Sequence, residues 1–177
     1  MEKIFTDEPN PVPSVQIDFS SAINTIQINQ IFNYAIKPNI LKDVDIIVET
    51  ENDLIFIEVK NSNRVDVINP NFNPKSDKKL NDVALKFYDS LLFTIFDNFA
   101  NHKRKIYCYL VEVAGGDSVL RNETKILLAD RLPFALQVQN KLQTKMIDEL
   151  EVLSFAEWNQ KFPQFPLTRL VDEITKN

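Results

Sequence analysis

Two consecutive apolar segments, residues 44–50 and 54–61, constrain the fold more than any other feature of the sequence. Each has the length of a strand and is rich in β-branched side chains, which favour extended backbone. The polar residues between them include Asn52 and Asp53, which tolerate the positive φ angles of a two-residue hairpin turn. We therefore expect a β-hairpin that turns at Asn52 and Asp53.

Three charged residues interrupt these apolar segments: Asp45, Glu58 and Lys60. The expected turn places Asp45 opposite Lys60. It also places Ile47 opposite Glu58, and opposed residues point to the same face of a sheet. The three charges are therefore expected to share one face, with the two carboxylates about 7–8 Å apart on a diagonal. Two carboxylates at that separation can bind one ion together.

The other face of the hairpin is expected to be the core face, because it carries six apolar side chains: Val44, Ile46, Val48, Ile55, Ile57 and Val59. Apolar side chains also lie on the charged face, so that face is not simply exposed to water. Charged groups on a partly covered face need partners or an ion. The alternative to an ion is a cross-strand ion pair between Asp45 and Lys60, with Glu58 solvated.

The rest of the chain alternates between strands and helices, which is typical of an α/β domain. The expected elements are, in chain order, a strand at 25–36, the hairpin, a long loop at 61–76, a helix at 76–100, a strand at 105–114, a helix at 122–143 broken at Pro133, a strand at 146–154 and a short helix from Ser154. Ser76 or Asp77 is expected to cap the long helix. Residues 1–13 contain three alternating prolines and are expected to form an extended N-terminal arm before a single domain at 14–177.

The composition excludes several classes of protein. The 177 residues include only two glycines, which are adjacent, so glycine-rich phosphate-binding loops are absent, and the single histidine excludes a multi-histidine zinc site. No apolar run approaches the roughly 20 residues of a membrane span. The single cysteine excludes an internal disulfide and favours a cytoplasmic location. A net charge of −5 argues against a surface coated in positive charge for nucleic acid, although a local basic groove remains compatible with it.

Asp45, followed thirteen residues later by Glu58-Val59-Lys60, resembles the PD-(D/E)xK nuclease superfamily, which has the restriction-endonuclease-like fold. The family pattern places an acidic residue at one strand and (D/E)xK on the next strand, with an apolar residue at x. The family core runs helix, three-strand meander, helix, strand, and residues 25–113 supply the meander, the second helix and the strand. The resemblance therefore implies a small single-domain α/β member, with an antiparallel three-strand meander followed by helix, strand, helix and strand, flanked by helices.

The chemistry that the resemblance implies is metal-dependent hydrolysis of phosphodiester bonds, with DNA as the expected substrate, in a defence or restriction-type system. Mg²⁺ or Mn²⁺ would bind the carboxylates of Asp45 and Glu58 and the backbone carbonyl of Val59. The ion would polarise the phosphate and help to ionise a bound water. Lys60 would hold that water or neutralise the charge that grows on the phosphate.

The chain departs from the family at one position, because many members carry a glutamate on the helix before the meander. Residues 20–35 contain no acidic residue, and nothing in the spacing selects Glu8 or Asp18 as a replacement. A catalytically inactive nuclease fold that acts as a binding or assembly module is therefore the alternative function. A homodimer or a larger complex is compatible with either function.

Lys75, Lys78 and Lys79 cluster at the start of the long helix and are candidates for phosphate contacts. The alternative is a solvated helix start. Further along the same helix, oppositely charged residues at helical spacing are expected to pair with one another: Asp82, Lys86 and Asp89.

Overall fold

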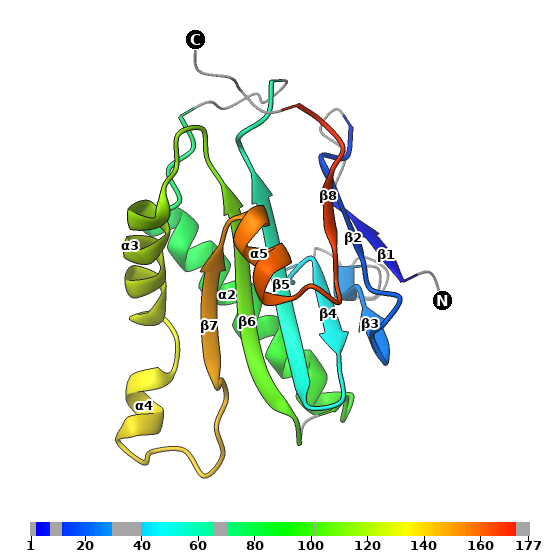
Figure 1. Cartoon of the computed structure of the whole chain (residues 1–177). Helices are drawn as coiled ribbons and strands as arrows, with labels where there is room; N and C mark the ends of the chain where they lie inside the picture. The colour runs from blue at the N-terminus through cyan, green and yellow to red at the C-terminus, as the bar shows by residue number, and fades with distance from the viewer. Residues whose placement is uncertain (1–2, 8–11, 30–39, 66–70, 101, 173–177) are drawn as a thin grey trace.

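The computed structural model describes residues 3–7, 12–29, 40–65, 71–100 and 102–172. Within those residues the chain forms an α/β structure with two sheets (Figure 1). The five-stranded sheet has the order β3-β4-β5-β6-β7, with bounds Asn24–Ile26, Ile46–Glu49, Asp53–Asn61, Arg104–Glu112 and Glu149–Leu153. The three-stranded sheet has the order β1-β2-β8, with bounds Ile4–Thr6, Val15–Asp18 and Leu167–Arg169. The described helices are α2 (Asp77–Phe96), α3 (Ser118–Ala129), α4 (Phe134–Val138) and α5 (Phe155–Lys161).

The five-stranded sheet is mixed. The pairs β3–β4 and β4–β5 are antiparallel, whereas β5–β6 and β6–β7 are parallel. Parallel neighbours need a crossover connection, and α2 supplies it between β5 and β6 (Figure 1). This crossover lays α2 across one face of the sheet, while α5 and the three-stranded sheet cover the other face (Figure 1).

Both faces of the hairpin are buried, which corrects the expectation of a single core face. Ile55 and Ile57 pack with residues of α5 and the three-stranded sheet. Leu54 and Phe56 pack in a second core against α2. A sheet covered on both faces has apolar side chains on both, so the charges of the hairpin point toward a covered face. Val44 belongs to this second core and not to the face on which it was expected.

The hairpin turns one residue earlier than expected, at Glu51 and Asn52. The amide of Thr50 donates to the carbonyl of Asp53 at 2.9 Å, and the amide of Asp53 donates to the Thr50 hydroxyl at 2.9 Å. The Thr50 hydroxyl thus accepts the hydrogen bond of the Asp53 amide, a backbone donor that it would not reach in the expected turn. As a result Ile47 is paired with Phe56 rather than with Glu58. The change moves each partner by two positions, so every side chain of β4 and β5 stays on its expected face.

Within the described residues, the expected strand at 25–36 is wrong at residues 27–29. β3 ends at Ile26, Ile28 and Asn29 are helical, and residues 30–39 lie outside the described part of the chain. Apolar residues in this stretch recur at spacings of four as well as two, so periodicity alone cannot distinguish a helix from a strand. Ile28 is completely buried in the same core as α2.

The later elements follow the sequence closely. Ser76 is the N-cap of α2, although its side chain makes no capping hydrogen bond, and α2 ends at Phe96. The expected break at Pro133 is confirmed, because Pro133 caps α4 after α3 has ended. Ser154 begins α5 with a complete capping box to Glu157. In the N-terminal segment, β1 pairs with β2, and the division into arm and domain stays a prediction. None of the described helices is both long and apolar enough to cross a membrane.

Candidate functional site

Asp45 and Glu58 come together at the point where β4 begins beside β5. Asp45 directly precedes β4, and the register that pairs Ile46 with Ile57 places it opposite Glu58 when continued by one residue. Asp45 Oδ2 accepts a hydrogen bond from the amide of Val59 at 2.7 Å. The side chain of Glu58 is only 8% exposed, whereas that of Asp45 is 25% exposed. The structure therefore holds a buried carboxylate beside a more accessible one.

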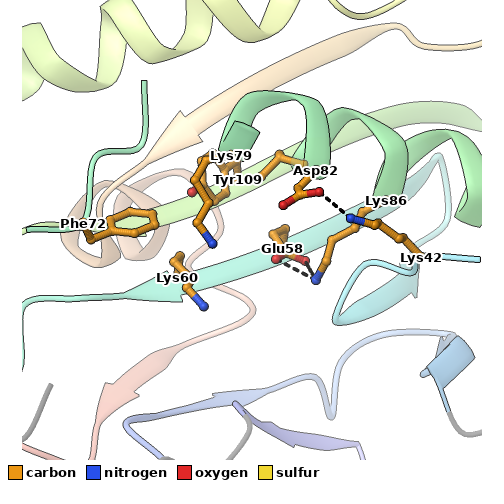
Figure 2. A pocket seen from close by; sticks show the side chains of 9 residues that line it. Lys42, Glu58, Lys60, Phe72, Lys79, Asp82, Lys86 and Tyr109 are labelled. Atoms are coloured by element: carbon orange, nitrogen blue, oxygen red, sulfur yellow. Dashed lines mark hydrogen bonds and ion pairs between the residues drawn. The ribbon is translucent and has the colours of Figure 1, made fainter. Parts of the chain in front are cut away.

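A lysine from α2 lies between these two carboxylates. Lys86 Nζ donates to both carboxylate oxygens of Glu58, each at 2.8 Å, and lies 3.8 Å from Asp45 Oδ1 (Figure 2 shows its contact with Glu58). Lys86 is positioned by its neighbours on α2, because Val83 and Phe87 are buried against the sheet. The two carboxylates of the hairpin therefore converge on one cationic group.

The burial of this cluster shifts the pKa values of its members. Burial, together with the negative charge of Asp45, raises the pKa of Glu58 to about 8, although Lys86 and Lys60 act to lower it. Burial also disfavours the charged form of Lys86, but the charges of Glu58 and Asp45 outweigh that effect and raise the pKa of Lys86. Lys86 therefore stays protonated, and Glu58 releases its proton most readily when a cation is beside it.

Lys60 lies on the same side of β5 as Glu58 but is exposed. Among the described residues its ammonium group makes no ion pair and no hydrogen bond, and Figure 2 shows it at the edge of the pocket. The alternative of an ion pair between Asp45 and Lys60 with a solvated Glu58 is therefore wrong. Lys86 has taken the role of counter-ion, which leaves Lys60 available to a bound molecule.

A pocket of about 140 Å³ lies beside this cluster, between α2 and the strands β5 and β6. Its lining residues are Lys42, Glu58, Lys60, Phe72, Lys79, Asp82, Val83, Lys86 and Tyr109 (Figure 2). Four lysines against two acidic residues make its wall basic, in a chain whose net charge is −5. The basic groove that composition left open is thus present locally, and two aromatic side chains contribute to the same wall.

The three phosphate-contact candidates separate in space. Lys79 lines the pocket, and its ammonium lies 5.8 Å from the centre of the Phe72 ring. Lys75 is instead bonded to Glu123 of α3 at 2.6 Å. Lys78 is exposed and does not contribute to the pocket. Of these three candidates, Lys79 alone lies at the site with Asp45, Glu58 and Lys60.

The charged residues of α2 do not pair with one another, which corrects that expectation. Lys86 reaches the hairpin, Asp82 binds the ammonium of Lys42, and Asp89 accepts a hydrogen bond from the Lys42 amide at 2.8 Å. Sequence reasoning therefore missed the contribution of Lys42 and Lys86 to the site. The available signal was the crossover itself, because a helix between parallel strands must pack one of its faces onto them.

The two residues considered as replacements for the glutamate that many family members carry are not brought to the site by the described part of the chain. Asp18 lies in β2 of the other sheet, where its carboxylate accepts a hydrogen bond from the Ser20 amide at 2.8 Å. Glu8 lies outside the described residues. Asp43 is close enough for its charge to raise the pKa of Lys86. In the described part of the chain, no group of three or more His, Cys, Asp or Glu residues is arranged to hold a metal ion.

The donor set of the site nevertheless fits a hard divalent cation that keeps several water ligands. Asp45 and Glu58 already share one cationic group, the ammonium of Lys86. The amide and carbonyl of a strand residue leave the strand on the same side. Since the Val59 amide is bonded to Asp45, the Val59 carbonyl is directed to the side where both carboxylates lie. These residues would supply three oxygen ligands.

Comparison with protein-family models, with curated proteins and with solved structures finds no match to this chain. These comparisons therefore assign no function to the site. That site consists of a buried carboxylate, an accessible carboxylate, one lysine that neutralises them and a second lysine that borders a basic pocket.

Proposed function

We propose that the chain is a metal-dependent nuclease of the PD-(D/E)xK type that hydrolyses phosphodiester bonds, with DNA as its substrate. One observation carries this proposal. The carboxylates of Asp45 and Glu58 converge on one cationic group, the ammonium of Lys86. This cluster lies next to the accessible ammonium of Lys60 and a basic pocket. Acidic ligands for a divalent ion beside cationic groups for phosphate are the combination that metal-assisted phosphodiester hydrolysis requires.

The arrangement of the elements supports the same proposal. The antiparallel strands β3, β4 and β5 are followed by α2 and by β6, which is parallel to β5. This is the order expected of a restriction-endonuclease-like core. The chain departs from a simple meander between β3 and β4, which are separated by residues 27–45. The likeness therefore concerns strands β3 to β6 and the helix α2, and not the connection between β3 and β4.

The proposed chemistry assigns a distinct role to each residue. Asp45, Glu58 and the carbonyl of Val59 would hold Mg²⁺ or Mn²⁺, which supplies a Lewis acid and a more acidic bound water. Lys60 stands at the pocket edge, where its ammonium can orient the attacking water or offset negative charge that develops on the phosphate. Lys79 lies on the same pocket wall and can contact a neighbouring phosphate.

The proposal is tested by a cleavage assay with linear and circular DNA, single-stranded DNA and RNA in Mg²⁺ or Mn²⁺. The parent is expected to cleave DNA, and Asp45→Asn is expected to reduce the rate at least about a hundredfold, because one ligand loses its charge. Asp97→Asn changes an exposed aspartate at the end of α2 and serves as the matched control. Equal rates for the two variants, or no cleavage by the parent in any condition, would contradict the proposal.

The second candidate function is a nuclease fold that binds a partner without cleaving it. Lys86 favours this candidate, because it neutralises both carboxylates without any metal ion. The basic pocket would then bind a phosphate of a nucleic acid, and Lys79→Met would weaken binding. In that case the parent binds nucleic acid equally well in EDTA and in Mg²⁺ and leaves it intact.

A further inference from the structure

We propose that Lys86 is an internal cation that occupies the metal position, so that a divalent ion binds only by displacing its ammonium group. This inference rests on the proposed metal site. Its basis is the position of Lys86 Nζ, which contacts both carboxylate oxygens of Glu58 at 2.8 Å and lies 3.8 Å from Asp45 Oδ1. Lys86 lies 26 residues beyond the Glu58-Val59-Lys60 motif and comes from a different element.

The ammonium and a metal ion cannot occupy this position together. A magnesium ion binds carboxylate oxygens at about 2.0–2.1 Å. Because Lys86 already holds both oxygens of Glu58, an ion that contacts Glu58 and Asp45 Oδ1 would lie close to the present position of its ammonium. Two cations at such a short separation repel each other strongly in a poorly solvated site, and the side chain of Glu58 is only 8% exposed. Metal binding must therefore move the ammonium away.

The pocket beside the site can receive the displaced ammonium of Lys86. Lys86 lines the pocket, and its side chain is 27% exposed, so it can turn toward the pocket without any movement of α2. Asp82 lies one helical turn earlier on the same pocket wall. Asp82 now binds Lys42, which comes from the segment before β4. After displacement, the ammonium of Lys86 would meet this carboxylate and add a positive charge to the pocket that a phosphate enters.

The consequence is a site that is stable without its metal. When both Asp45 and Glu58 are ionised and no cation is beside them, they repel each other and destabilise the fold, because Glu58 is buried. Lys86 removes that penalty in the metal-free state, but it competes with the ion for the same oxygens. The affinity for metal is therefore lower than the two carboxylates alone would give. A monovalent ion has too little charge to displace the lysine. Competition with Lys86 therefore also makes the site selective for divalent ions.

The test is calorimetric titration of Mg²⁺ into the intact chain at pH 9, where protons compete least for Glu58. Lys86→Met is expected to bind Mg²⁺ at least about tenfold more tightly than the parent, since it lacks the competing charge. The same variant is expected to melt at a lower temperature than the parent in EDTA. Lys86→Gln keeps a polar side chain without the charge and gives the same comparison if Lys86→Met does not fold.

Lys125→Met is the matched control, because Lys125 is also a helix lysine that binds a strand glutamate, Glu151, at 2.9 Å. It should lower the melting temperature without changing the affinity for Mg²⁺. If Lys86→Met or Lys86→Gln binds Mg²⁺ no more tightly than the parent, the displacement model is overturned.

The outcomes separate this inference from the proposed function. If the parent cleaves DNA while the Lys86 variants bind Mg²⁺ with unchanged affinity, the nuclease stands and the displacement model falls. If only the Lys86 variants bind Mg²⁺, the lysine blocks the site as proposed, and the parent is no metal-dependent nuclease by itself. If no form binds Mg²⁺, both proposals are overturned.

Discussion

Glu58 combines two properties that oppose each other, burial and the ionisation that binding of a cation requires. Its side chain is buried on the α2 side of the sheet, yet it must lose its proton to bind a cation. Burial and the Asp45 carboxylate raise the pKa of Glu58 to about 8, against a usual value near 4.5. Glu58 therefore releases its proton at a higher pH than an ordinary glutamate, and the ammonium of Lys86 favours that release.

The raised pKa predicts how the stability of the metal-free protein depends on pH. Between about pH 4.5 and pH 8 the native state holds a proton on Glu58 that the unfolded state has released. The free energy of unfolding therefore falls as the pH rises through this range. Urea unfolding in EDTA should show a loss between pH 5.5 and pH 8.5 that is larger by at least about 1 kcal/mol in the parent than in Glu58→Gln. Identical pH profiles for the two proteins would show that Glu58 has an ordinary pKa.

Lys60 gives the second prediction at the scale of a residue. It is no metal ligand, and its ammonium acts on charge that appears only during the reaction. Lys60→Met should therefore lower the cleavage rate about a hundredfold while the affinity for Mg²⁺ is kept or increased. Lys78→Met, at an exposed lysine outside the pocket, should cleave at the parental rate. A parental cleavage rate for Lys60→Met would remove Lys60 from the mechanism.

At the scale of elements, the hairpin shows what could be predicted from the sequence. Alternation placed Asp45, Glu58 and Lys60 on one face, and it survived an error in the turn because the pairing moved by an even number of residues. The turn itself was missed because the Thr50 hydroxyl competes for the Asp53 amide. The crossover indicated that α2 packs on the sheet, but it did not select Lys86, because the angle and position at which α2 crosses the sheet decide which of its side chains reach the hairpin.

The helix caps provide a prediction for separate elements. Ser154 and Ser76 are both N-cap residues, but only the side chain of Ser154 accepts a hydrogen bond from a backbone amide, that of Glu157. Ser154→Ala should therefore lower the free energy of unfolding by about 1 kcal/mol, whereas Ser76→Ala should change it little. Urea unfolding of the two variants gives the comparison directly. Equal losses would mean that the capping hydrogen bond of Ser154 contributes nothing.

At the scale of the whole molecule, the site is built from several elements that are distant in the sequence. Asp45 precedes β4, Glu58 and Lys60 belong to β5, Tyr109 belongs to β6, and α2 contributes Lys86. These residues come together only when the five-stranded sheet and its crossover helix have formed. A ligand of this site therefore binds the native state and not the unfolded chain, so it stabilises the entire fold by mass action.

This linkage gives the last prediction. Mg²⁺ or Mn²⁺ at about one hundred times its dissociation constant should stabilise the parent by about 2.7 kcal/mol and raise its melting temperature. Glu58→Gln should lose that increase, because an amide is a poor ligand and the variant leaves Asp45 as the one anionic ligand of the proposed site. Glu151→Gln removes another lysine-bonded glutamate, on β7, and should lower the melting temperature while keeping the response to metal. A rise of the same size in Glu58→Gln would place the bound ion elsewhere on the molecule, and the two carboxylates of the hairpin would then serve only to hold α2 through Lys86.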